Sequence, residues 1–452
     1  MLPTTDLMTT SQKILELNAF DMKSAAGLDP AAAELVARRQ RTFGPTSMLF
    51  YKRPLNLVRG DGVWLYDADG TRYLDAYNNV PSVGHCNPRV VEAVARQMAS
   101  LNTHTRYLYD IVYTYAERLL ATMPGELSNI VFTCTGSESV DLALRIARNV
   151  TGGTGFIATQ NAYHGNTTTA TEVSPASANG EAPNPNIYYV PAPDTYRSDP
   201  GSVGKLLNAS VAAAIEDMRA KGIRFAGMIA DSIFSSDGVY PGQPGFLGET
   251  VATVRAAGGL YIADEVQPGF GRTGAAMWGF QRHGIVPDIA VMGKPMGNGY
   301  PVGGVAIKPA LLEAFGSKSG YFNTFGGSPV AAAAGLAVLD ALKDDRLQDN
   351  AHDTGGYLLE QLQKLSGNHP YVGDVRGAGL YLAVEFVKDK ASRTPDKVRA
   401  VNGVNAMRDQ NILIGTAGLH GNIWKIRPPL CFDRGHADMF LEGFEAVLKT
   451  MS

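Results

Sequence analysis

Short apolar runs alternate with longer amphipathic stretches from about residue 105 to about residue 330 of this chain. The runs are too short for helices, and glycine or proline residues bound them, a pattern typical of buried strands. We expect strands at residues 130–133, 156–158, 225–230, 260–263 and 289–292, and helices at 138–149 and 203–221. Because strands that alternate with helices form parallel sheets, the pattern predicts an α/β domain with a mostly parallel sheet.

The two ends of the chain differ from this middle part. Helices are expected at 31–41 and 88–100, a hairpin with an Asp-Gly turn at 63–75, then helices at 330–342 and 352–365 and an alternating strand at 379–386. We therefore predict an N-terminal extension at 1–45, a small α+β domain built from 46–75 and 331–452, and a large domain at 76–330.

Composition describes an ordinary globular protein of 452 residues, with 45% hydrophobic and 18% charged residues. A formal net charge of −3 gives no electrostatic reason to expect a nucleic acid or an anionic membrane as partner. The three cysteines are far apart and odd in number, which favours a reducing compartment. The N-terminus lacks the features of a secretion signal, and the longest apolar stretch, 330–342, is too short to span a bilayer. We expect a cytoplasmic protein.

Two charged residues stand at the ends of neighbouring apolar runs. Asp264 ends the run at 260–263, and Lys294 follows the run at 289–292. Buried strands do not usually end in charge unless the charge has a use there. An amine that forms an imine and an acid that holds a pyridinium proton are the pair that pyridoxal phosphate chemistry needs. No metal site is expected.

Three further segments have the composition of parts of a cofactor site. Gly136 and Ser137 lie between a strand and a helix and could form an anion cradle, although an ordinary capped helix has the same pattern. Tyr163 follows the next strand and could stack on a planar cofactor, but it could equally belong to a surface turn. Thr324, before the helix at 330–342, could donate to a phosphate or simply cap that helix.

Residues 269–274 match the glycine pattern G-x-G-x-x-G of dinucleotide-binding sites. Asp264 and Glu265 would place negative charge where a pyrophosphate should lie. The next strand also follows too soon to leave room for a crossover helix. We interpret the match as accidental.

Taken in order, these segments resemble the class III (omega) aminotransferases of PLP fold type I, from about residue 45 to the C-terminus. The likeness is carried by 136–138, 163–165, 264–267, 269–274, 293–299 and 324–327. The resemblance implies a seven-stranded, mostly parallel sheet in the large domain, pyridoxal 5'-phosphate as cofactor, and a homodimer with shared active sites.

The resemblance also implies a role for each matching residue. Lys294 would carry the cofactor and then move the substrate proton, and Asp264 would keep the cofactor ring nitrogen protonated. Val266 and Tyr163 would pack on opposite ring faces, and Gln267 would bind the ring oxygen. Gly136 and Ser137 would bind the cofactor phosphate, and Thr324 would complete the phosphate site of the neighbouring subunit.

Four positions bear on the substrate. Lys425 stands where many relatives have an arginine that grips a carboxylate, and Asp231 stands where relatives often have a glutamate. The Lys425 motif resembles a branch that contains phospho-lyases acting on phosphoethanolamine or phosphohydroxylysine, and also bacterial amine transaminases. Phospho-lyases tend to carry a basic residue near the apolar Met48 and a histidine at Tyr300.

We therefore expect an omega-aminotransferase that moves an amino group from a primary amine or omega-amino acid to pyruvate or a similar 2-oxo acid. The alternatives are an ammonia-releasing phospho-lyase acting on a phosphorylated amine such as phosphoethanolamine and, more remotely, a non-catalytic PLP-binding protein.

Overall fold

The computed structural model describes residues 17–22, 27–46, 48–177 and 183–451. Its largest sheet has seven strands in the order β4-β10-β9-β8-β7-β5-β6. The strands are β4 (Asn129–Thr133), β5 (Gly155–Thr159), β6 (Ile187–Val190), β7 (Phe225–Asp231), β8 (Leu260–Asp264), β9 (Ile289–Met292) and β10 (Gly303–Ile307). Only β10 runs against its neighbours, so the expected mostly parallel sheet is confirmed.

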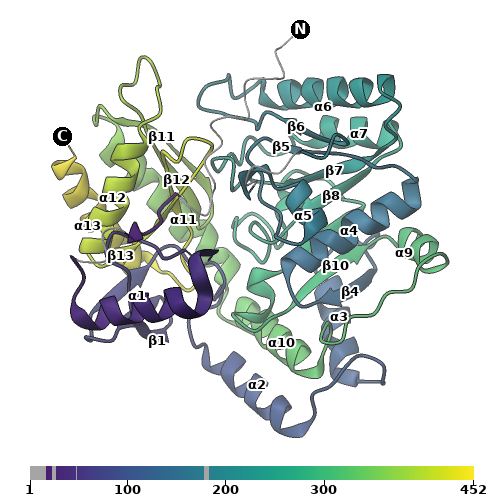
Figure 1. Ribbon diagram of the computed structural model, residues 1–452, viewed down its shortest axis with the longest axis horizontal. Helices are drawn as coiled ribbons and strands as arrows, with labels where there is room; N and C mark the ends of the chain where they lie inside the picture. The colour runs from purple at the N-terminus through teal and green to yellow at the C-terminus, as the bar shows by residue number, and fades with distance from the viewer. Residues whose placement is uncertain (1–16, 23–26, 47, 178–182, 452) are drawn as a thin grey trace.

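Helices cover both faces of this sheet, as Figure 1 shows on its right side. Alternate residues of β8 belong to different apolar clusters: Ile262 packs with α4, whereas Tyr261 and Ala263 belong to the cluster that contains α6. Burial on both faces explains why the strand is an unbroken apolar run. The helices of this part are α4 (Gly136–Thr151), α5 (Thr168–Glu172), α6 (Val203–Ala220), α7 (Gly248–Ala256), α8 (Gly279–Arg282) and α9 (Pro309–Gly316), with short 3₁₀ turns η5 (Pro175–Ser177) and η6 (Lys294–Gly297).

Two four-stranded sheets form the other side of the molecule (Figure 1). One joins β1 (Leu57–Asp61), β2 (Trp64–Asp67) and β3 (Arg72–Asp75) to β13 (Ile412–Leu413), and the other has the order β11 (Val372–Ala378), β12 (Tyr381–Phe386), β15 (Ile423–Ile426), β14 (Gly415–Ala417). Since β13 pairs in parallel with β3, segments from both ends of the chain share one sheet.

The remaining helices are α1 (Pro30–Phe43), α2 (Pro88–Ser100), α3 (Asp110–Leu120), α10 (Pro329–Asp344), α11 (Leu347–Ser366), α12 (Lys397–Asp409) and α13 (Arg434–Thr450), with the 3₁₀ turn η4 (Gly44–Thr46). The expected helices at 31–41, 88–100, 330–342 and 352–365 are all present, as is the hairpin at 63–75. Helix α10 packs against α2 and α3 as well as α11, so the predicted boundary at residue 331 falls within the first turn of a helix that contacts both parts. The domain division stays a prediction.

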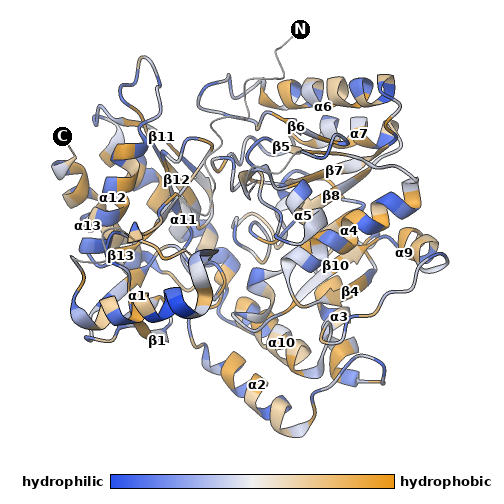
Figure 2. Cartoon of the chain, viewed as in Figure 1, coloured by the Kyte–Doolittle hydropathy of each residue, from blue (hydrophilic) through white to orange (hydrophobic). Residues whose placement is uncertain are grey.

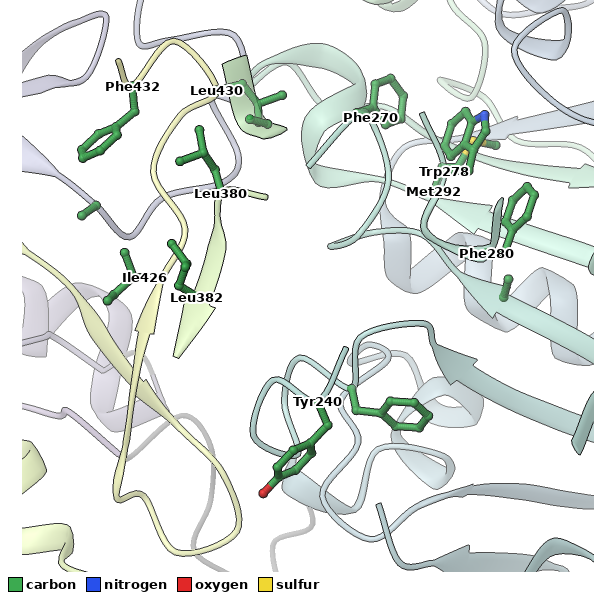
Figure 3. Packing of buried hydrophobic residues seen from close by; sticks show 14 of the residues in the cluster. Tyr240, Phe270, Trp278, Phe280, Met292, Leu380, Leu382, Ile426, Leu430 and Phe432 are labelled. Atoms are coloured by element: carbon green, nitrogen blue, oxygen red, sulfur yellow. The ribbon is translucent and has the colours of Figure 1, made fainter. Parts of the chain in front are cut away.

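The apolar core runs without interruption from one side of the molecule to the other. Figure 3 shows Phe270, Trp278 and Phe280 beside the large sheet, and Leu382 and Ile426 on the sheet that contains β12 and β15. All five residues belong to a single cluster. Hydrophobic residues concentrate on the strands and on the inner faces of the helices (Figure 2). No helix within the described ranges is both long and apolar enough to cross a membrane.

Candidate active site

A cavity of about 190 Å³ lies at the carboxyl ends of the parallel strands. Tyr163, Ser236, Gln267 and Lys294 follow β5, β7, β8 and β9 respectively, which is the edge where open α/β sheets bind ligands. The other lining residues come from the N-terminal segment and the smaller sheet: Leu17, Asn18, Phe50, Tyr77, Gly415, Thr416, Lys425 and Arg427. The cavity therefore contains the predicted lysine and is closed by parts of the chain far from it in sequence.

Lys294 opens the turn η6 directly after β9. The backbone before it is tightly packed, because a Cβ added to Gly293 would lie 3.0 Å from the backbone nitrogen and Cα of Gly136. This contact places Lys294 beside the N-terminus of α4. Burial of the amine, and then the charge of Arg427, lower the pKa of Lys294 to about 8. A larger fraction of neutral amine is available than an exposed lysine would have, which suits a nucleophile and base.

Asp264 ends β8 and is 4% exposed. Its Oδ1 accepts a hydrogen bond from the backbone nitrogen of Val266 at 2.9 Å, and its Oδ2 lies 2.6 Å from Nδ1 of His164. The sequence predicted a role only for Tyr163 in the segment 163–165, so His164 was missed. Its position next to the predicted ring-stacking residue was the available signal. The buried histidine holds the carboxylate in a fixed orientation.

Asp231 lies opposite Asp264 in the pairing of β7 with β8. Ser235 donates to its carboxylate from Oγ at 2.5 Å and from the backbone at 2.8 Å, and Ile233 donates from the backbone at 2.8 Å. Burial raises the pKa of Asp231, and the Ser235 hydrogen bond opposes this shift. The side chain is held within the protein and is not among the described residues that line the cavity.

The N-terminus of α4 has the shape of an anion cradle. Thr135 caps the helix by accepting from the backbone of Glu138 at 3.2 Å, so the capped helix expected as an alternative is also present. Ser137 Oγ accepts from the backbone of Asn166 at 3.1 Å. Gly165 has φ +153°, and a Cβ there would lie 2.8 Å from Ser137 Oγ. The loop thus approaches the helix start closely and leaves room there for backbone amides to face an anion.

Val266, Gln267 and Tyr163 are brought to the same place. A Cβ on Gly136 would lie 3.1 Å from Val266, so the valine packs against the helix start. Gln267 donates to Ser235 Oγ at 2.6 Å and accepts from Tyr381 at 2.9 Å and from Arg427. Tyr163 is half-buried, and burial raises the pKa of its phenol.

Lys425 and Arg427 are two positions apart at the end of β15, and the period of a strand directs such residues to the same side. Lys425 is 4% exposed and Arg427 is 8% exposed. Burial first, and then the charges of Arg427 and Lys294, lower the pKa of Lys425 well below its usual value. Arg427 was missed from the sequence; its spacing from Lys425 was the available signal. A bound anion would relieve the repulsion among these cations.

Three of the predicted site residues, Met48, Tyr300 and Thr324, are not part of the cavity lining. Met48 is 42% exposed, and Tyr300 is half-buried with its backbone bound to Gly297; both are outside the described residues that line the cavity. The expected roles of Met48 and Tyr300 toward the substrate stay predictions. Thr324 is exposed in the loop before α10 and likewise stands apart from the cavity lining. Its expected role in a partner's site stays a prediction.

These residues fit pyridoxal 5'-phosphate. Gly136, Gly165 and Gly293 pack closely around the start of α4, and a Cβ on any of them would crowd a neighbouring residue. The glycines therefore leave the helix start open to a phosphate. Asp264, oriented by His164, can accept from a protonated ring nitrogen, and Lys294 has a lowered pKa and no hydrogen bond or ion pair to any described residue.

Comparison with known families agrees with this geometry. Residues 50–448 match the family described as aminotransferase class-III. The chain belongs to the class III aminotransferase family. It is 41% identical over 428 residues to the Drosophila melanogaster protein named alanine–glyoxylate aminotransferase 2-like, an alignment that covers 92% of this chain and 87% of that protein.

Two solved structures show the same fold. A phospholyase from Arthrobacter in complex with phosphoethanolamine superposes with a TM-score of 0.89 at 42% identity, covering 92% of this chain and 99% of that one. An (S)-enantioselective omega-transaminase from Thermomicrobium roseum superposes with a TM-score of 0.83 at 33% identity, covering 93% and 99%. The expected fold type I and the expected branch are confirmed, and the chain is a PLP-dependent enzyme. Because some similar proteins are named as mitochondrial, the cytoplasmic location stays a prediction.

Proposed function

We propose that this enzyme is an ammonia-releasing phospho-lyase that acts on a small phosphorylated amine such as phosphoethanolamine. One observation carries the proposal: Lys425 and Arg427 line the same cavity as Lys294, and none of the described lining residues is acidic. A phosphate monoester carries about two negative charges near neutral pH and needs such a cationic pocket when it leaves. The similarity to a phospholyase solved with phosphoethanolamine supports the same reading.

The residues of the cavity and its surroundings would have separate roles in such an elimination. Lys294 accepts the proton from the carbon that bears the amino group, since its lowered pKa leaves much of the amine neutral. Asp264, held by His164, keeps the proton on the cofactor ring nitrogen. When bound, PLP supplies the electron sink for this deprotonation. Lys425 and Arg427 hold the phosphate as its carbon–oxygen bond breaks. The net reaction converts phosphoethanolamine and water to acetaldehyde, ammonia and inorganic phosphate.

A second candidate is the omega-aminotransferase expected from the sequence. Phe50 and Tyr77 line the cavity, and their ring centroids lie 5.6 Å apart in an edge-on arrangement, which suits the apolar part of an amine donor. In that case Lys425 and Arg427 would bind the carboxylate of a 2-oxo acid. Its single negative charge would balance the two basic side chains less completely than the two charges of a phosphate. The two functions share Lys294 and Asp264 and differ in the fate of the substrate.

Product analysis separates the two functions. We expect holoenzyme given phosphoethanolamine, without any 2-oxo acid, to release phosphate and ammonia in equal amounts. Lys425→Met should reduce this rate about 100-fold, because a charge-assisted contact to the phosphate is lost. Lys205→Met, at an exposed position on α6, is the matched control and should keep full activity. Amino transfer from amines to pyruvate with no phosphate release would reject the lyase in favour of the aminotransferase.

We also propose that two copies of the chain form a homodimer across the exposed loops 101–108 and 321–325. Leu108 is 89% exposed and Phe325 is 71% exposed. The guanidinium of Arg106 lies 4.0 Å from the ring centroid of Phe322, so the two loops adjoin, and we take their exposed apolar residues together as one patch. Large exposed apolar patches mark protein–protein interfaces. A partner would bury this patch together with Thr324.

Oligomeric state tests the homodimer. The wild type is expected to have the mass of a dimer in light scattering, and Leu108→Asp should shift it toward the monomer because burying a carboxylate at the interface is costly. Val398→Asp is the control, since Val398 is 70% exposed on α12, away from these loops. A monomeric wild type, or a Leu108→Asp variant as dimeric as the control, would contradict the proposal.

A further inference from the structure

We infer that Ser235 and Tyr381 are positioning residues, which hold Gln267 and through it orient the guanidinium of Arg427 toward the anionic group of the substrate. The inference rests on the proposed function, in which Arg427 binds that group, and adds two residues behind the cavity wall. Neither Ser235 nor Tyr381 is among the described residues that line the cavity. Their effect on a ligand must therefore pass through Gln267 and Arg427.

Strand pairing places Tyr381 beside Arg427. Leu382 of β12 lies opposite Ile426 of β15 in an antiparallel pair, so Tyr381 and Arg427 are the next two opposed positions along these chains. Side chains that oppose each other in a sheet point to the same face, and Lys425 shares this face because it is two positions from Arg427. The phenol of Tyr381 is therefore on the cavity side of the sheet, although it is itself completely buried.

A continuous chain of hydrogen bonds joins Arg427 to a buried carboxylate. The guanidinium of Arg427 donates from Nη1 to Oε1 of Gln267. Nε2 of Gln267 donates to Oγ of Ser235 at 2.6 Å, and this Oγ donates to Oδ2 of Asp231 at 2.5 Å. Tyr381 donates its hydroxyl to Oε1 of Gln267 at 2.9 Å. The amide of Gln267 is thus held at both its oxygen and its nitrogen.

The two ends of this chain fix the direction of every hydrogen bond in it. A guanidinium can only donate, and an ionised carboxylate can only accept. The atom of Gln267 that faces Arg427 must therefore be the oxygen, which leaves the nitrogen to face Ser235. Asp231 accepts from Ser235 Oγ and from the backbone nitrogens of Ile233 and Ser235, three donors that favour its ionised form. The charges at the two ends thus determine how the Gln267 amide is turned.

The orientation of Arg427 matters because a guanidinium binds an oxyanion best through two parallel N–H groups. Its five N–H groups lie in one plane, and Gln267 takes one of them, so the bond to Gln267 sets the direction of the others. The ring centroid of Tyr77 lies 4.6 Å from the guanidinium carbon and supports that plane from its face. Loss of the hydroxyl of Ser235 or Tyr381 would let Gln267 turn, so Arg427 would be less preorganised for an anion.

Inorganic phosphate is the probe for this effect. Holoenzyme saturated with PLP is titrated with inorganic phosphate, and binding is followed by competitive inhibition of amine turnover and by the cofactor absorbance. Tyr381→Phe keeps the ring and removes the hydroxyl, and we expect it to weaken phosphate binding about fivefold. Ser235→Ala breaks the same chain on the other side of Gln267 and should weaken binding by a similar factor, which gives a second test if Tyr381→Phe does not fold.

A double-mutant cycle shows whether the effect passes through Arg427. Arg427→Lys keeps the positive charge but loses the planar fork of donors. In this background Tyr381→Phe should weaken phosphate binding less than about twofold further, because the group that it orients is gone. A residue with a merely structural role would weaken binding by the same factor in both backgrounds. Equal factors, or unchanged phosphate binding in both Tyr381→Phe and Ser235→Ala, would overturn the inference.

Tyr115→Phe is the matched control. Tyr115 is a buried tyrosine on α3, and its hydroxyl has no hydrogen-bond partner among the described residues. This variant loses the same hydroxyl from a buried ring, away from the described cavity lining, so it should bind phosphate as the wild type does.

The outcome also separates this inference from the proposed function. Phosphate binding that is weaker in Tyr381→Phe and Ser235→Ala, in an enzyme that releases no phosphate from phosphoethanolamine, would keep the role of the two residues and reject the lyase reaction. Phosphate release by an enzyme in which both variants bind phosphate normally would support the lyase reaction and reject the role of these residues.

Discussion

Replacement of Lys294 by alanine is expected to lower turnover about 10⁴-fold, because the substitution removes the residue that we propose as the base for the substrate proton. The variant should still fold, since the side chain has no hydrogen bond or ion pair with any described residue. Steady-state rates of phosphate and ammonia release, measured beside the cofactor absorbance spectrum, check this prediction. The variant should bind PLP without the absorbance that depends on the lysine.

Lys205→Ala is the matched control for this variant, because Lys205 is an exposed lysine on α6. It should keep wild-type rates and the wild-type spectrum. If Lys294→Ala retained wild-type turnover, the assignment of Lys294 as the base would be wrong. This result would instead favour a PLP-binding role for the cavity in which Lys294 has no catalytic part.

Asp264→Asn is expected to lower turnover on the order of 10³-fold, with weaker retention of PLP. Asparagine keeps the size of the side chain but removes the negative charge that favours a protonated ring nitrogen. The loss should be largest in kcat, because the charge matters most when electron density moves toward the ring. Single-turnover kinetics with excess PLP separate this effect from cofactor loss.

The control for the charge change is Asp353→Asn, at an exposed position on α11. His164 offers an internal check, since its Nδ1 lies 2.6 Å from the Asp264 carboxylate and its substitution by phenylalanine should give a smaller loss of the same kind. Equal kcat in Asp264→Asn and the wild type at saturating PLP would show that the ring nitrogen has another partner.

The apolar patterns along the chain were enough to predict the parallel sheet and the place of its site. Buried strands are unbroken apolar runs, and their carboxyl ends meet at one edge, so Asp264 after one run and Lys294 after another could be expected to lie close together. Strand β10 was not expected, since it begins with Gly303 and Gly304, and glycine is depleted in strands. The structure shows that these glycines allow close packing: a Cβ on Gly303 would lie 2.5 Å from Oγ1 of Thr133.

The contacts that build the cavity and its surroundings could not be predicted in the same way. His164 meets Asp264 across 100 positions, and Arg427 meets Gln267 across 160. Asn18, in a segment with no recognisable motif, lines the cavity, and Met48, which the sequence singled out, is 42% exposed, so its role stays a prediction.

By itself the sequence determined the fold class and the cofactor, and it predicted Lys294 and Asp264 as the residues that carry the chemistry, because local periodicity and strand ends contain that information. Only the tertiary structure decided which side chains close the substrate cavity, because strands and loops from both ends of the chain meet there. Their contact depends on packing between distant segments, which no local pattern records.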